Sequence, residues 1–351
     1  MNNTRGRVLD RGLDAFVAEA ERGYPEAAHV MAFPRAQGFM VERDEQVGDI
    51  FQRACMVETL VAIRDRTGRD LRDLIVHETD YLLSMRRGYA PGGWGYFPTL
   101  HELPPDADDL AVVIRALIAA NRRDAVTAHC VEPLLVLIEE CRTGPGMFET
   151  WIVPRRGDAV HDRQRWWIAN AWGQGPDCEV IANLVHALTR FDSVRYAGTI
   201  AECAARLGEI QAADGSWPSS WYHGSFYAGW VCSLALGAQG KPTACWRAYL
   251  RDSQRQDGGW GWSGSSDVLS TAFAVLALPA DDAASARGRR FLEQTQDEDG
   301  LWPAIPWIKM ELGRSQGRIR QVLSYGSRTI SGSFALQALL HSREENRPWP
   351  P

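Results

Sequence analysis

Six apolar segments recur along the chain, and charged amphipathic segments alternate with them. Each apolar segment is hydrophobic on most helical faces, which predicts a helix that is buried on most sides. The six segments cover residues 51–60, 110–117, 180–188, 228–236, 270–278 and 332–339. Segments 126–140, 193–211, 245–254 and 284–296 have one polar face, which predicts an outer layer of helices. Convincing period-two alternation is lacking, so no strand is expected.

This alternation predicts an all-α fold, a single α/α toroid ((α/α)6 barrel) in which six inner helices are wrapped by about six outer helices. No linker rich in Pro, Gly or Ser divides the chain. Residues 1–351 are therefore expected to form one domain, with residues 1–45 as an N-terminal extension or helix packed on the barrel.

A degenerate element of the form Gln-x-x-x-Gly-x-Trp follows successive outer segments. It occurs at residues 211–217, 254–260 and 296–302, and a version without Gln stands at 92–94. In each copy the glycine permits a turn that a side chain would obstruct. The tryptophan is then predicted to fold back against the end of the preceding helix, as a structural clamp between helices.

Three carboxylates, Asp106, Asp108 and Asp109, fall within four residues, immediately before the apolar segment 110–117. Carboxylates crowded at the edge of an apolar interior cannot all ionise cheaply, so at least one is expected to keep its proton at neutral pH. A neutral carboxylic acid that faces an apolar cavity is a Brønsted acid suited to a target with few polar groups, such as a carbon–carbon double bond. A plain helix N-cap is the competing interpretation of Asp106 or Asp109.

Alignment of the repeats places Asp108 at the same position as Glu179 and Tyr227, and Asp106 at the same position as Asp177. The inner helices of a toroid begin at one mouth of the barrel, so these polar residues are predicted to gather around one central cavity. Helix N-termini favour a carboxylate over a neutral acid, which makes the conjugate base easier to form.

Composition narrows the range of partners. The 14 Trp residues outnumber both Phe and Tyr, and an indole ring is the strongest of the cation-binding aromatic faces. A net charge of −6 gives no indication of the basic surface with which proteins bind nucleic acid.

Seven cysteines without a Cys-x-x-Cys pair predict reduced, buried thiols in a cytoplasmic protein. No signal peptide or membrane span is expected, and peripheral membrane contact through an exposed apolar patch stays open.

The Asp-x-Asp-Asp motif, in register with the Gln-Gly-Trp repeats over residues 92–339, resembles the class II terpene cyclases, such as squalene–hopene cyclase. The resemblance implies that Asp108 is the proton donor and that Asp106 and Asp109 help to orient it. It further implies that Asn183 hydrogen-bonds the donor, at a position where plant diterpene cyclases also carry Asn. Tyr227 matches a tyrosine that holds a water against the acid.

The same resemblance implies an aromatic lining that stabilises a carbocation. The candidate lining residues are Tyr96, Trp151, Trp221, Trp262, Trp307 and Tyr325. Glu179 is left open as a second carboxylate of the acid site, a terminating base or an ion-pair partner. No cofactor and no metal site are expected, and Mg²⁺ enters only if the substrate is a diphosphate.

The chain also departs from the family pattern. It has room for one barrel where squalene–hopene cyclase has two, Ser220 replaces an arginine, and the late aromatic cluster is thinned to Tyr325 and Phe334. A single barrel is similar to the monodomain cyclases of prenylated aromatic acids. The expected activity is therefore proton-initiated cyclisation of a linear isoprenoid, namely the farnesyl or similar tail of such an acid, or a prenyl diphosphate. The product is an isomer unless water terminates the reaction.

Other classes stay open at this stage. A glycoside-active α/α barrel would use Asp108 and Glu179 as a paired acid and base. A zinc prenyltransferase subunit would need Asp, Cys and His ligands at one mouth, but no His stands at a position that matches Asp177-Cys178. A toroid that binds an apolar ligand without catalysis is the third alternative. Arginines 155, 156, 163 and 165 form either a solvated loop or a site for an anionic head group at the mouth.

Overall fold

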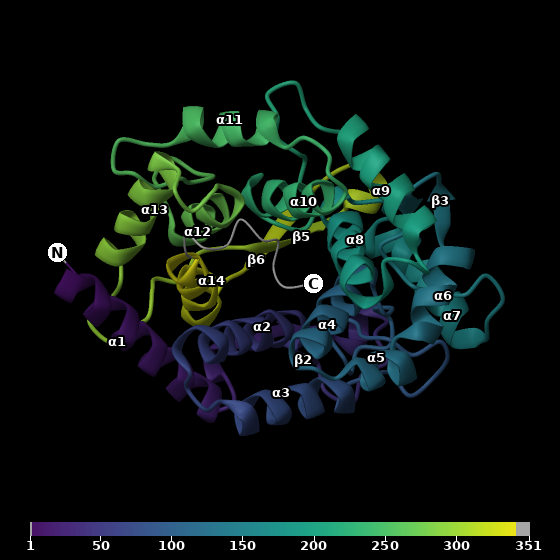
Figure 1. Ribbon diagram of the computed structural model, residues 1–351. Coiled ribbons are helices and arrows are strands. Elements are labelled where there is room, and N and C mark those ends of the chain that lie inside the picture. Colours follow the sequence, from purple (N-terminus) through teal and green to yellow (C-terminus); the bar gives the residue numbers. More distant parts are fainter. Residues whose placement is uncertain (1, 342–351) are drawn as a thin grey trace.

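The protein, seen here as a computed structural model, is described over residues 2–341. Six inner helices contact one another in sequence order, and the last contacts the first, so the ring is closed (Figure 1). They are α2 (Ile50–Thr67), α4 (Ala107–Ala119), α8 (Cys178–Asp192), α10 (Phe226–Ala238), α12 (Val268–Ala277) and α14 (Arg328–Leu340). The predicted α/α toroid is confirmed, because each apolar segment of the sequence lies in one inner helix, except that segment 270–278 extends one residue past the end of α12.

An outer layer of helices surrounds this ring. It comprises α1 (Asn2–Glu21), α3 (Arg72–Ser84), α5 (Arg123–His129), α6 (Val131–Glu140), α9 (Ala197–Glu209), α11 (Ala244–Ser253) and α13 (Ala283–Gln294). The predicted segment 126–140 is divided between α5 and α6. Pro133 explains the division, because it has no N–H to donate to the carbonyl of residue 129. The N-terminal α1 lies beside α13 and α14 and completes the layer.

Three antiparallel hairpins interrupt the helical pattern, so the expectation of no strands was wrong. They are β1–β2 (His29–Ala32, Glu45–Gly48), β3–β4 (Arg142–Gly144, Met147–Phe148) and β5–β6 (Ile308–Leu312, Gln321–Tyr325). Neither face of β5 is fully buried, so its sequence has no reason to alternate. The remaining helical segments are α7 (Ala159–Trp167), the π-helical turn η3 (Ile168–Trp172) and three short 3-10 turns: η1 (Pro25–Ala27), η2 (Arg35–Gln37) and η4 (Arg314–Gln316).

The tryptophans of the repeated element clamp outer helices as predicted. Each indole N–H donates to the backbone carbonyl ten residues earlier, near the end of the preceding outer helix, over 2.7–2.8 Å. The pairs are Trp217 with Leu207, Trp260 with Leu250, and Trp302 with Leu292. Each glutamine side chain closes the turn by donating to its own glycine carbonyl. The three glycines have φ of 87–93°, a region that other residues rarely adopt.

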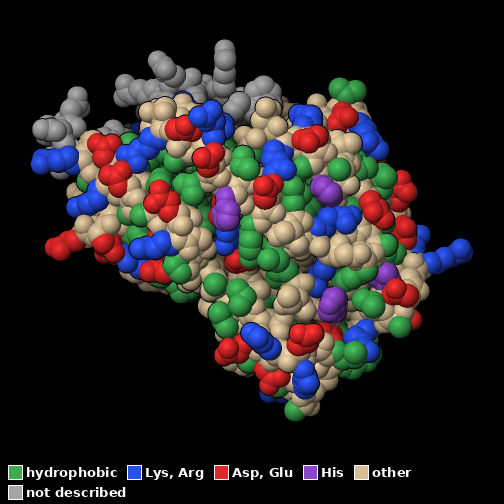
Figure 2. All heavy atoms as spheres, turned by 90° about the horizontal axis from the view of Figure 1, so that it is seen from below, with side chains coloured by type: hydrophobic (Ala, Val, Ile, Leu, Met, Phe, Trp, Pro, Cys, Tyr) green, Lys and Arg blue, Asp and Glu red, His purple; other side chains and the backbone are tan. Residues whose placement is uncertain are grey.

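Three features relate to the environment of the protein: the apolar character of its helices, the charge of its surface and the exposure of its thiols. Within residues 2–341, no helix combines the length and apolar character that a membrane crossing requires. Figure 2 shows basic and acidic side chains interspersed over one side of the molecule. Six of the seven cysteine thiols are buried, whereas Cys245 is exposed, so the prediction of buried thiols was wrong for that residue.

Candidate active site

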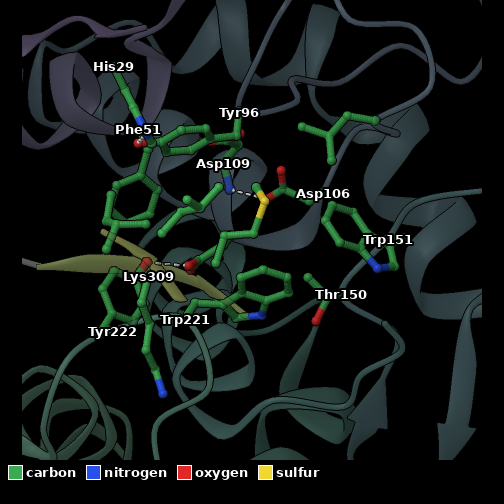
Figure 3. Close-up of a pocket in the computed structure, with 15 residues that line it drawn as sticks. His29, Phe51, Tyr96, Asp106, Asp109, Thr150, Trp151, Trp221, Tyr222 and Lys309 are labelled. Carbon is green, nitrogen blue, oxygen red and sulfur yellow. Dashed lines mark hydrogen bonds between the residues drawn. The ribbon is translucent and has the colours of Figure 1, made fainter. Parts of the chain in front are cut away.

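A cavity lies at the mouth where the inner helices begin. It contains about 620 Å³ of space free of protein atoms, its opening to solvent included. Its wall contains three carboxyl groups, five aromatic rings and four aliphatic side chains, three of these four from the β5–β6 hairpin (Figure 3). His29, Thr150 and Lys309 complete the wall. The aromatic rings are those of Phe51, Tyr96, Trp151, Trp221 and Tyr222. The surface of the cavity is therefore mostly apolar, and its polar groups are the aspartates, His29, Thr150 and Lys309.

Asp106 caps the N-terminus of α4. Its Oδ1 accepts a hydrogen bond of 2.7 Å from the backbone N–H of Asp109, and its own N–H donates to the carbonyl of Trp94. Burial raises the pKa of its carboxyl, although the hydrogen bonds that it accepts oppose the rise. The cap holds α4 so that Asp108 and Asp109 lie in the first turn and face the cavity.

Asp108 is buried and has two partners. Its Oδ1 accepts from Nδ2 of Asn183 at 2.7 Å, and its Oδ2 lies 2.5 Å from the hydroxyl of Tyr222. Burial raises the pKa of Asp108 to about 7, and the hydrogen bonds from Tyr222 and Asn183 limit the rise. At neutral pH this carboxyl can therefore hold a proton and also release it.

Asp109 is the most isolated of the three carboxyls. Only 1% of its surface is exposed, and neither carboxyl oxygen has a hydrogen-bond partner among the described residues. Burial raises its pKa well above the ordinary value, and the negative charges of Asp106 and Asp108 act in the same direction. Burial and mutual repulsion thus favour a protonated carboxyl within the motif.

Tyr222, which the sequence did not single out, contacts the acid directly, whereas Tyr227, which was expected to hold a water against the acid, reaches it through Asn183. Tyr227 lies behind the cavity wall, and its hydroxyl accepts from Asn183 at 2.9 Å. Tyr222 follows Trp221 in a loop that pairs with Ile308 of β5. No repeat position marks Tyr222, so only the folded loop brings it to Asp108.

Two predicted tryptophans and one tyrosine line the cavity. The indole N–H of Trp151 donates to the carbonyl of Gly173, and that of Trp221 donates to Oδ2 of Asp177, each over 2.7 Å. Their polar edges are thereby occupied, which leaves the ring carbons for the cavity. The hydroxyl of Tyr96 is likewise held, by the side chains of Gln52 and His29.

Three predicted aromatics lie elsewhere. Trp262 is 40% exposed and stacks on His223. Trp307 is buried against Tyr222, one layer behind the cavity wall. Tyr325 donates to the carbonyl of residue 27, beneath the β1–β2 hairpin. The structure does not bring these rings to the cavity lining, because each stands on a loop or strand whose course the helical repeats do not fix.

Glu179 supports the wall from behind. Its Oε1 accepts hydrogen bonds from the backbone N–H groups of Ser220 and Trp221, at 2.6 and 2.9 Å. It is fully buried and does not line the cavity. Its contacts fix the loop that carries Trp221 and Tyr222.

The β5–β6 hairpin covers part of the mouth. The N–H of Lys309 donates to the carbonyl of Trp221, and Arg314 at the hairpin tip pairs with Asp177 and lies over the Trp221 ring. The arginines 155, 156, 163 and 165 do not line the cavity. Among the described residues, no group of three or more His, Cys, Asp or Glu side chains is placed to hold a metal ion.

The profile of the squalene-hopene cyclase C-terminal domain matches residues 64–309, more than half of the chain. The chain belongs to this family. Squalene–hopene cyclase of Bradyrhizobium diazoefficiens is 28% identical over 247 residues, which are 60% of this chain and 36% of that protein. Labda-7,13-dienyl diphosphate synthase of Streptomyces clavuligerus is 26% identical over 225 residues, 62% of this chain and 36% of that protein. The chain thus spans little more than a third of the length of these two relatives.

Solved structures share the fold of this family member. A variant of the type II terpene cyclase MstE from Scytonema, in complex with its product merosterolic acid A, has a TM-score of 0.72 and 16% identity, over 97% of this chain and 98% of that one. A possible member of the GH105 family from Klebsiella pneumoniae has a TM-score of 0.59 and 11% identity, over 97% and 93%. At these identities the likeness shows the toroid alone, so the family assignment rests on the sequence match.

Proposed function

We propose that this family member is a class II terpene cyclase in which Asp108 protonates the terminal double bond of an isoprenoid chain. One observation carries the proposal: a buried carboxyl group, bound by Asn183 and Tyr222, faces a cavity whose other walls are almost entirely apolar. An apolar cavity favours an apolar substrate, which offers this carboxylic acid a double bond to protonate in place of a polar group.

The reaction follows from proton and electron balance. The proton of Asp108 adds to the less substituted carbon of the terminal double bond, and a tertiary cation forms on the other carbon while Asp108 becomes a carboxylate. The next double bond attacks this cation, and each ring closure moves the charge along the chain. Loss of a proton gives an isomer of the substrate, and addition of water gives a hydrated product. Asp108 must then recover a proton before the next turnover.

Aromatic faces stabilise the moving charge. A desolvated cation over an aromatic ring gains about 2 kcal/mol or more. Tyr96, Trp151 and Trp221 surround the space in front of Asp106 in Figure 3. The apolar wall also excludes water, which would otherwise quench the cation early.

The proposed substrate is the farnesyl or similar tail of a prenylated aromatic acid, with a prenyl diphosphate as the second candidate. MstE, whose fold this chain shares over nearly the full length of both, was solved with geranylgeranyl dihydroxybenzoate as its substrate. The match to a diphosphate synthase supports the second candidate. Lys309 lines the cavity and provides a cation for an anionic head group.

The test incubates purified protein with farnesyl and geranylgeranyl dihydroxybenzoate and with the two corresponding prenyl diphosphates. Mass spectrometry should find a product isomeric with one substrate, formed in the presence of EDTA when the head group is a benzoate. One deuterium should enter the product in heavy water. Asp108→Asn should abolish conversion.

Asp267→Asn is the matched control. Asp267 caps inner helix α12 by accepting from the N–H of Ser270, much as Asp106 caps α4, but it does not line the cavity. This variant should keep its activity. Conversion that survives Asp108→Asn would refute Asp108 as the acid. Binding of a substrate without any conversion would favour a toroid that binds an apolar ligand without catalysis, and conversion of a glycan would favour the glycoside-active alternative.

A further inference from the structure

A buried ionic cluster lies behind Asp108, and the mechanism above uses none of its members. Nη2 of Arg115 on α4 lies 2.5 Å from Oε2 of Glu58 on α2. Nη1 of Arg190 on α8 lies 3.0 Å from the other oxygen of the same carboxylate. The side chains are at most 8% exposed. Desolvating three charges in this way is expensive, so the cluster needs an explanation beyond packing.

The cluster reaches the acid through Asn183. Arg115 stands seven residues after Asp108, two helical turns along the same face of α4. Its Nη1 donates to Oδ1 of Asn183 at 2.8 Å, and Nδ2 of Asn183 donates to Oδ1 of Asp108 at 2.7 Å. A guanidinium group has no acceptor atom, so the Asn183 atom that meets it must be the carbonyl oxygen. Arg115 therefore fixes the amide with its NH₂ group toward the acid.

This orientation determines which oxygen of Asp108 carries the proton. Oδ1 accepts from Asn183, and the carbonyl oxygen of a neutral carboxylic acid is its better acceptor. The proton is then on Oδ2, and the hydroxyl of Tyr222 in the cavity wall, which donates to Oδ2 when Asp108 is ionised, accepts from it when Asp108 is neutral. A flipped Asn183 would present its own carbonyl oxygen and hold the proton on Oδ1, on the side away from the substrate.

The charges of the cluster balance only when the acid ionises. Two guanidinium groups share the single carboxylate of Glu58, which leaves one uncompensated positive charge. Release of the proton by Asp108 supplies the missing negative charge. The cluster thus favours the conjugate base at the moment of proton transfer, while burial keeps the resting acid protonated.

We propose that Arg115, held in place by Glu58 and Arg190, is a positioning residue that orients Asn183 and thereby places the proton of Asp108 on the oxygen facing the cavity. The inference rests on the proposed role of Asp108 as the acid. Arg115 does not line the cavity, so it acts only through Asn183.

The test changes Arg115 to Met and follows the protonation of Asp108. The signal is the carbonyl stretch of the neutral acid, isolated as the infrared difference between each protein and its Asp108→Asn counterpart and titrated with pH. The variant removes the cation near Asp108 and the hydrogen bond by which Arg115 holds Asn183. Together these losses should raise the pKa of Asp108 by about 1 to 2 pH units. On a converted substrate, kcat should fall about 10- to 100-fold while KM stays within about twofold.

The Arg115→Met variant keeps all the other ionisable residues that surround Asp108. They are Asp106 and Asp109 on α4, Cys55 and Glu58 on α2, Glu179, His186 and Arg190 on α8, Tyr227 on α10 and Tyr222 in its loop.

Arg53→Met is the matched control. Arg53 forms a similar buried, bidentate salt bridge with Glu78, in which Nε and Nη2 each lie 2.9 Å from a carboxylate oxygen. Its hydrogen bonds do not connect it to Asp108. It should lose similar stability and leave the pKa of Asp108 unchanged. An equal pKa in the Arg115 and Arg53 variants would overturn the proposal.

Glu58→Gln provides a second test if Arg115→Met does not fold. It removes a negative charge and keeps Arg115, so the pKa of Asp108 should fall; an unchanged or higher value would contradict the inference. The infrared titration needs no substrate. Failure of every substrate, or an active Asp108→Asn, would therefore reject the proposed function and still leave the effect of Arg115 measurable.

Discussion

Replacement of Asp108 by Asn should stabilise the protein, and the gain should grow with pH. In the folded protein burial raises the pKa of this carboxyl from 3.8 to about 7, which corresponds to about 4 kcal/mol of folding free energy. Because the folded pKa lies above the unfolded one, the stabilisation from the bound proton is complete below pH 4 and is lost as the pH rises through 7. Asparagine does not titrate and does not suffer this loss.

The assay is urea unfolding of the wild type and the variant, followed by circular dichroism, between pH 5 and pH 8. About 2.5 kcal/mol of the loss falls in this range, so the variant should gain that amount relative to the wild type. Asp124→Asn, which changes an exposed carboxylate on α5, is the control and should show no such trend. A stability difference that stays constant within about 0.5 kcal/mol across the range would refute the assignment of a neutral, buried acid.

Four further substitutions test the site and the clamps. Tyr222→Phe removes the hydroxyl beside Oδ2 of Asp108 and should lower kcat about 10- to 100-fold in steady-state kinetics. Trp217→Phe removes a buried indole hydrogen bond and should lower the free energy of unfolding by about 1–3 kcal/mol, while the product distribution on chromatography stays the same. Trp221→Ala should release early-terminated products, whereas Trp262→Ala, whose ring is away from the cavity, should not; equal effects would contradict the placement of these rings.

The sequence predicted those site residues that stand at repeat positions of the inner helices. Asp106 caps inner helix α4, Asp108 lies in its first turn and Asn183 lies in the second turn of α8, so their convergence follows from the repeat. Trp262 and Tyr325 were expected at the cavity from composition and resemblance, and the structure places them elsewhere. Their positions depend on loops and strands, for which the helical period gives no rule.

The sequence alone determined the toroid, the clamps and the group of carboxylates at one mouth, because these depend on periodic spacing and on local turn chemistry. Only the tertiary structure decided that Tyr222 contacts the acid and that Arg115 contacts its partner Asn183. Tyr222 reaches Asp108 across 114 positions of the sequence, and Arg115 reaches Asn183 across 68. Contacts at such separations are set by how the inner helices pack and by where the β5–β6 hairpin crosses the mouth. Neither leaves a periodic signal in the chain.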